Sequence, residues 1–151
     1  MKKIINLTLL IIWMIVIFLF SSADSKKSIA TSDKVIDTGI TITESISGNK
    51  TSSESKEKTI DDLTVVVRKF AHFTEYVILG ILMINCLKDY NLKKVILISI
   101  VLCILYASSD EIHQYFVGRT SSIFDVCIDS IGSLTGIFTY KKIKFLSNKR
   151  I

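Results

Sequence analysis

The sequence predicts an all-α fold, a four-helix transmembrane bundle with both termini in the cytoplasm. Two observations support this prediction: the apolar residues gather in four long blocks, and the basic residues concentrate in the polar segments at one predicted side of the membrane. Apolar residues make up 49% of the 151 residues although 22% are charged. Proline is absent, and only 6 glycines and 3 cysteines occur, which excludes a collagen-like chain and a disulfide scaffold.

The four apolar blocks span residues 4–20, 63–87, 95–116 and 123–140. A helix needs about 20 mostly apolar residues to cross a bilayer, with about 17 as the lower limit. Strands of soluble sheets usually run only about 3–10 residues. A span in lipid must satisfy its own backbone polar groups, so each block is predicted to be a helix of one membrane domain, residues 1–151.

The first block also has features of a cleavable signal peptide, because Lys2 and Lys3 precede it and small residues follow it. The apolar region of a signal peptide usually has about 7–15 residues and ends at an Ala-x-Ala-like site. Residues 4–20 form a longer block, and the site is imperfect. We therefore expect a retained anchor, with cleavage as the alternative.

A hydrophilic segment, residues 21–62, separates the first two blocks and is predicted to be a long outer loop. It is rich in Ser, Thr, Asp, Glu and Lys. Residues 47–56 have almost no apolar side chains and are predicted to be flexible. Scattered Ile and Val residues in 29–46 are consistent with a short surface helix.

The short polar segments fix the predicted orientation. Ten basic residues flank the blocks on one side, against a single acid, Asp89, whereas the long loop carries six Lys and eight Asp or Glu. The ten are Lys2, Lys3, Lys88, Lys93, Lys94, Lys141, Lys142, Lys144, Lys149 and Arg150. The positive-inside rule places these residues and both termini in the cytoplasm. The net charge of +5 is thus explained by topology and by anionic lipid, and we expect no nucleic-acid partner.

Ionisable residues inside spans are costly and usually functional, and here they all fall in the predicted outer half of the membrane. The second block contributes Arg68, His72 and Glu75, spaced as one helical stripe. In the third, Asp110, His113 and Gln114 are spaced to share a face. We expect these stripes to face the bundle interior, where they form a polar pocket together with Glu111, Arg119, Asp125 and Asp129.

Other interpretations of single residues stay open. His72 fits a structural histidine equally well, and Asp125 and Asp129 fit counter-ions of the two arginines. Glu111 lies about 100° from the Asp110 stripe, which favours the lipid headgroups. Two histidines and several carboxylates suit zinc, but no His-Glu-x-x-His motif or paired cysteine occurs, so we expect no metal and no cofactor.

Two ordered segments resemble signatures of the VanZ-like family of bacterial membrane proteins. Residues 68–76 (Arg-Lys-Phe-Ala-His-Phe-Thr-Glu-Tyr) with Gly80 resemble its second-helix signature. Residues 109–114 (Ser-Asp-Glu-Ile-His-Gln) resemble a second block, which continues through Gly118, Arg119, Asp125, Asp129, Gly132 and Gly136. Val117 stands where the family often has proline. The resemblance implies a multi-pass protein of the bacterial cytoplasmic membrane, of the type associated with resistance to the lipid-tailed glycopeptide teicoplanin.

Gly80, Gly132 and Gly136 are predicted to allow close packing of helices, because small residues let helix backbones approach each other in membranes. The favoured function is binding of an amphiphile or lipid-linked envelope component in the polar pocket, with Arg68 and Arg119 contacting phosphate or carboxylate groups. The alternative is an intramembrane hydrolase or transferase, with His72 or Glu75 as the base and Asp110 and His113 as acid or metal ligands. A purely structural bundle partner is a third interpretation. The sequence decides neither whether the protein is an enzyme nor whether it forms a homo-oligomer.

Overall fold

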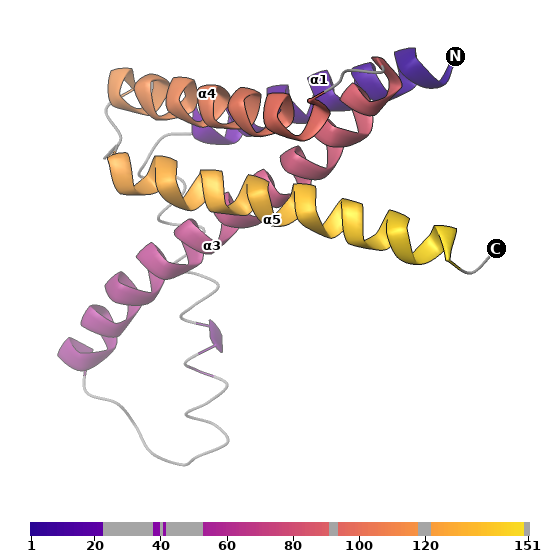
Figure 1. Ribbon diagram of the computed structural model, residues 1–151. Coiled ribbons are helices and arrows are strands. Elements are labelled where there is room, and N and C mark those ends of the chain that lie inside the picture. The colour runs from indigo at the N-terminus through magenta and orange to yellow at the C-terminus, as the bar shows by residue number, and fades with distance from the viewer. Residues whose placement is uncertain (23–37, 40, 42–52, 91–93, 118–121, 150–151) are drawn as a thin grey trace. The chain divides into compact units, whose positions relative to one another are not determined.

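A computed structural model describes residues 1–22, 38–39, 41, 53–90, 94–117 and 122–149. The chain divides into two units, Met1–Ser22 with His72–Ile151, and Ala23–Ala71. In the described residues all secondary structure is helical: α1 (Lys2–Ser21), α3 (Ser53–Leu87), the short 3-10 helix η1 (Lys88–Tyr90), α4 (Val95–Phe116) and α5 (Ile123–Asn148) (Figure 1). The predicted all-α class with four long helices is confirmed.

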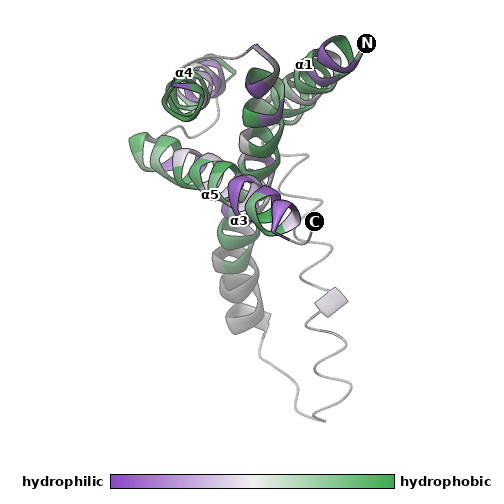
Figure 2. Ribbon diagram, turned by 45° about the vertical axis from the view of Figure 1, so that its right-hand side comes forward, coloured by the Kyte–Doolittle hydropathy of each residue, from purple (hydrophilic) through white to green (hydrophobic). Residues whose placement is uncertain are grey.

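The four helices are long and apolar enough to cross a membrane, over Lys2–Ser21, Leu63–Leu87, Val95–Phe116 and Ile123–Asn148. Hydrophobic residues run along them, and α5 becomes hydrophilic toward its C-terminal end (Figure 2). Only 17% of the α1 span and 33% of the α3 span are buried inside the protein. Much of the apolar surface therefore points outward, as expected of helices whose solvent is lipid.

Helix α1 exceeds its predicted bounds by one or two residues at each end, and two other helices extend much further. The helix α3 begins at Ser53 rather than at residue 63, so part of the predicted loop is helical, and α5 continues to Asn148 rather than ending at residue 140. Both extensions are rich in Lys, Glu, Leu and similar residues with good helix propensity. Low hydrophobicity ends a membrane span but does not end a helix. The predicted surface helix over 29–46 lies outside the described residues apart from Thr38, Gly39 and Thr41, whose backbone is helical.

Helices α3 and α5 touch along their backbones, and glycine makes this contact possible. A Cβ atom added at Gly80 would lie 2.2 Å from the Ser133 carbonyl oxygen, and one at Gly136 would lie 2.0 Å from that of Val77. At Gly132 the nearest atom would be the Phe73 carbonyl oxygen, at 2.6 Å. No side chain fits at any of these positions without moving a backbone.

Aromatic side chains attach α1 to the bundle. The Trp13 indole Nε1 donates to the Glu75 carbonyl oxygen on α3 at 3.0 Å, and the Tyr106 hydroxyl on α4 donates to the Met14 carbonyl oxygen at 2.6 Å. Ile17 of α1 is fully buried. It belongs to a core with the buried side chains of Tyr76, Leu79, Cys103, Ala107 and Ile137.

The α3–α5 contact gives a first prediction. Gly136→Ala should lower the free energy of unfolding by at least about 1–3 kcal/mol, the usual cost of overpacking, because its Cβ meets the Val77 carbonyl. Thermal unfolding of the purified protein in detergent measures the loss. Gly39→Ala is the control, because its Cβ would meet nothing within 4 Å. Equal unfolding temperatures for the two variants would contradict the close backbone contact.

Candidate functional site

Three helices of the bundle bring ionisable side chains together in one buried cluster. His72 on α3, Asp110 on α4 and Asp129 on α5 each offer a ligand atom, and these atoms all lie within 4.8 Å of one another. The two carboxylate residues are 3% and 1% exposed. The α3–α5 contact explains their proximity, because Asp129 lies one turn before Gly132, and Gly132 packs against Phe73 and Tyr76.

Polar atoms in this cluster are poorly satisfied by the protein itself. Within the part of the chain that the structure describes, both carboxylate oxygens of Asp129, Oδ1 of Asp110 and the hydroxyls of Tyr76 and Ser133 are buried without a hydrogen-bond partner. Each such group costs about 1–3 kcal/mol of stability. Two adjacent buried carboxylates also repel unless a proton or a cation lies between them. The cluster is therefore better suited to holding a ligand than to stabilising the fold.

Neighbouring side chains hold the cluster in place. The Gln114 side-chain amide, 3% exposed, donates to Asp110 Oδ2 at 3.0 Å. His72 Nδ1 lies 3.9 Å from Glu75 Oε2, and both side chains are partly exposed, at 17% and 18%. The carboxylates are thus packed in the core, and the His72 and Glu75 side chains beside them are mostly buried.

His113 does not join this cluster, although its spacing predicted a shared face with Asp110 and Gln114. Its ring stacks on Phe18 of α1, with ring centroids 4.3 Å apart, and its Nε2 lies 2.9 Å from the Ser22 hydroxyl. Successive helical residues differ by about 100°, so His113 and Gln114 point to different neighbours of α4. The prediction that His113 shares a face with Asp110 and Gln114 was wrong, because His113 contacts α1.

Glu111 was predicted to belong to the polar pocket, with the headgroups as the alternative direction. It is 7% exposed and does not point to headgroups: its Oε2 accepts the Ser122 backbone N–H at 3.1 Å. Ser122 is the N-cap of α5, and its own side chain accepts the Phe124 N–H at 3.2 Å. Glu111 thus joins the end of α4 to the start of α5, a role that periodicity alone does not reveal.

The remaining predicted pocket residues are less constrained. Asp125 is half-buried in the first turn of α5, where the helix dipole favours a carboxylate. Arg119 lies outside the described residues. Arg68 is half-buried on α3 and belongs to the unit Ala23–Ala71, which is described separately from the bundle. The contacts predicted between these arginines and the carboxylates therefore stay predictions.

Sequence reasoning missed a second polar network, at the opposite end of the bundle. Asn85 Nδ2 donates to Asn6 Oδ1 at 3.1 Å, and the Tyr140 hydroxyl donates to Asn85 Oδ1 at 3.0 Å. The Lys88 ammonium donates to both Asn85 and Tyr140. Lone asparagines in apolar spans were the available signal, since polar side chains bond across helices in membranes.

The ligand set of His72, Asp110 and Asp129 fits a metal ion chemically. Catalytic zinc sites combine three protein ligands, histidines and carboxylates among them, with an open position for water or substrate. No metal was expected from the sequence because it has no His-Glu-x-x-His motif and no paired cysteines. Here the three come from three helices, and no single-helix motif describes them.

Asp129→Asn tests whether the cluster costs stability. The amide removes the repulsion between two carboxylates and its Nδ2 can donate to Asp110, which should raise the free energy of unfolding by about 1–3 kcal/mol, seen as a higher thermal unfolding temperature. Asp125→Asn is the matched control, one turn earlier on α5. It should lower stability by about 0.3–1 kcal/mol, because it removes a favourable dipole interaction. A marked loss of stability in Asp129→Asn would show that Asp129 has a structural role.

Glu111→Leu tests the connection between α4 and α5. It removes the acceptor of the Ser122 N–H and should lower the free energy of unfolding by about 1 kcal/mol. Glu111→Gln keeps a side-chain oxygen at that place and should stay near wild type. If both variants unfold at the same temperature, the hydrogen bond is not what positions the start of α5.

Comparison with family models matches residues 6–146 to the model described as VanZ/LLP1. No curated protein and no solved structure matches the chain.

Proposed function

The chain belongs to the VanZ/LLP1 family, and from this premise we propose that it is a protein of the bacterial cell envelope that binds the polar group of an amphiphile. The ligand class includes phospholipids, lipid-linked wall precursors and lipoglycopeptides. The protein is a multi-pass membrane protein, as its four apolar helices and its family indicate. The proposed membrane is the bacterial cytoplasmic membrane, with the polar cluster under its outer face.

The observation that carries this proposal is the convergence of His72, Asp110 and Asp129 from three helices within 4.8 Å. Such groups are expensive in a membrane and are usually kept for function. The Asp129 oxygens have no internal donor among the described residues, so amines or hydroxyls of a ligand can supply one. Arg68 and Arg119, where they reach the ligand, would contact its phosphate or carboxylate.

Teicoplanin resistance is the proposed biological readout, because a lipid-tailed glycopeptide combines a polar body with a membrane anchor. Capturing such a molecule, or the lipid-linked precursor that it targets, requires a polar site that opens to lipid. The proposed entry lies at His72 and Glu75, whose side chains are partly exposed. A drug without a lipid tail would not be drawn to a site inside the membrane.

A second candidate function is hydrolysis or group transfer on a lipid-linked substrate. The zinc-like ligand set of His72, Asp110 and Asp129 favours it, with Glu75 beside His72 as a candidate base. Metal-bound water supplies a nucleophile at neutral pH. His113 takes no part in this version, because it faces α1. Purified protein with stoichiometric metal, and activity abolished by chelation, would favour the enzyme over the binding protein.

The binding function is tested by drug sensitivity. A strain lacking the protein should become more sensitive to teicoplanin but not to vancomycin, and wild-type protein should restore resistance. His72→Ala and Asp129→Asn should fail to restore it, with membrane protein levels unchanged. Ser130→Ala is the control, since its hydroxyl bonds to the Val126 carbonyl in its own helix at 2.7 Å.

Two results would contradict this proposal. If deletion leaves sensitivity to both drugs unchanged, the link to lipoglycopeptides fails. If the two cluster variants restore resistance as well as Ser130→Ala does, the cluster is not the binding site. Loss of the protein from the membrane in both variants would indicate a structural role for the cluster.

A further inference from the structure

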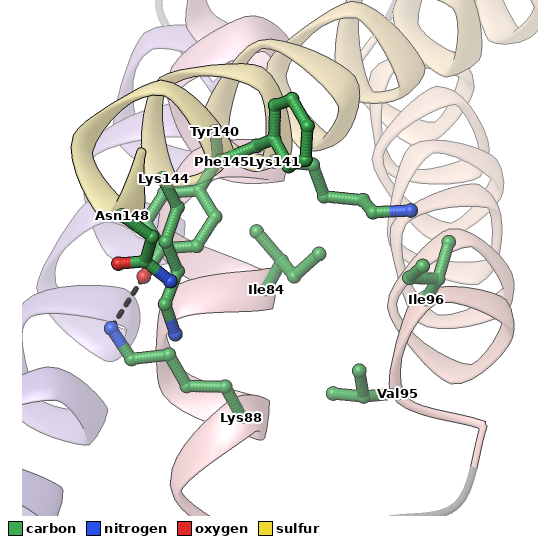
Figure 3. Close-up of a pocket in the computed structure, with 9 residues that line it drawn as sticks. All are labelled: Ile84, Lys88, Val95, Ile96, Tyr140, Lys141, Lys144, Phe145 and Asn148. Atoms are coloured by element: carbon green, nitrogen blue, oxygen red, sulfur yellow. Dashed lines mark hydrogen bonds between the residues drawn. The ribbon is translucent and has the colours of Figure 1, made fainter. Parts of the chain in front are cut away.

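A pocket of about 290 Å³ opens at the end of the bundle opposite the polar cluster. It lies where η1 follows α3, where α4 begins and where α5 ends (Figure 3). Nine residues line it: Ile84, Lys88, Val95, Ile96, Tyr140, Lys141, Lys144, Phe145 and Asn148. All of them belong to the unit that contains α1, α4 and α5.

The polar part of this lining is strongly basic. Lys88 comes from η1 and Lys144 from the last turns of α5, and their ammonium groups lie on the same side of the pocket, whereas that of Lys141 points toward Ile96 (Figure 3). The described residues that line the pocket include no acid. Positive charge from three lysines with no acid among the described lining residues favours a bound anion.

Lys88 differs from a lysine that serves only to set topology. It is half-buried, and its ammonium donates to Asn85 Oδ1 and to the Tyr140 hydroxyl. Asn85 is in turn held by Asn6 of α1. An ammonium has three donors, so two are used inside the protein and the third is left for a ligand. Lys88 is therefore a positioned donor rather than a freely moving surface charge.

The remaining lining is apolar. Ile84, Val95, Ile96 and Phe145 form the walls beside the lysines (Figure 3). A free phosphate ion gains nothing from contact with apolar walls. The glycerol and first acyl carbons of a phospholipid can pack against them. The location at the ends of membrane spans also matches the depth of lipid headgroups.

We propose that this pocket binds the headgroup of an anionic phospholipid, with Lys88 and Lys144 at its phosphate, Lys141 adding positive charge from the other side of the pocket, and the apolar walls against its glycerol region. Basic pockets between membrane helices on the cytoplasmic side bind anionic headgroups in this way. The charge pattern predicts that this end of the bundle is cytoplasmic. The site is independent of the proposed function, because it lies at the other end of the helices.

Lipid titration of the detergent-purified protein, followed by native mass spectrometry, tests the proposal. The probes are phosphatidylglycerol, phosphatidylcholine and inorganic phosphate. Wild-type protein should prefer phosphatidylglycerol, and Lys141→Gln with Lys144→Gln should weaken its binding about tenfold. Both lysines are exposed, so this variant should fold. Lys2→Gln with Lys142→Gln is the matched control, with the same change of charge from exposed residues outside the pocket.

The pocket is supported if only the Lys141 and Lys144 variant loses the preference for phosphatidylglycerol. Equal weakening in both double variants would overturn the proposal in favour of a diffuse basic surface. Displacement of the lipid by inorganic phosphate at equal concentration would overturn it in favour of a free-anion site. Equal binding of phosphatidylglycerol and phosphatidylcholine would also overturn it.

Discussion

The close backbone contact between α3 and α5 is the constraint on which the rest of the bundle depends. In lipid, helices gain little from the hydrophobic effect when they associate, so packing of small residues has to hold them together. Gly80, Gly132 and Gly136 allow the two backbones to touch. The same contact brings Asp129 beside α3, where it meets His72, and α4 adds Asp110. The packing of α3 against α5 and the position of Asp129 beside His72 thus both follow from this backbone contact.

The two ends of the bundle treat polar groups differently. At one end Asn6, Asn85, Lys88 and Tyr140 satisfy one another across α1, α3, η1 and α5. At the other end the Asp129 oxygens and the Tyr76 hydroxyl are buried and have no partner among the described residues. A satisfied network contributes to stability, whereas unsatisfied groups reduce it. A local group of unsatisfied polar side chains that lowers stability is typical of a functional site.

The fold was predictable because block length and charge are physical requirements of the membrane. A block of about 20 apolar residues is typical of a membrane-spanning helix. The third helix was predicted over residues 95–116, and the structure has it at the same residues. Helix ends in water were less predictable, as the start of α3 at Ser53 illustrates. There the chain leaves the apolar block but keeps residues that favour a helix.

The site was predictable only in part. Costly carboxylates on three spans indicated a cluster, and the structure places Asp110 and Asp129 beside His72. Periodicity gives the direction of a side chain on its own helix but not which helix it meets. His113 therefore contacts α1, and Glu111 accepts the Ser122 N–H rather than facing headgroups. Lys88 was counted as a topological charge, because its partners Asn85 and Tyr140 are brought to it only by folding.

A double-mutant cycle between Asp110 and Asp129 tests the central claim most directly, because it measures whether the two carboxylates share one site. The free energy of unfolding is measured for Asp110→Asn, Asp129→Asn and the double variant. Groups in contact couple by about 0.5–3 kcal/mol, whereas distant groups add within about 0.3–0.5 kcal/mol. A coupling above about 0.5 kcal/mol is the predicted result. Strict additivity would mean that the helices do not bring these residues together.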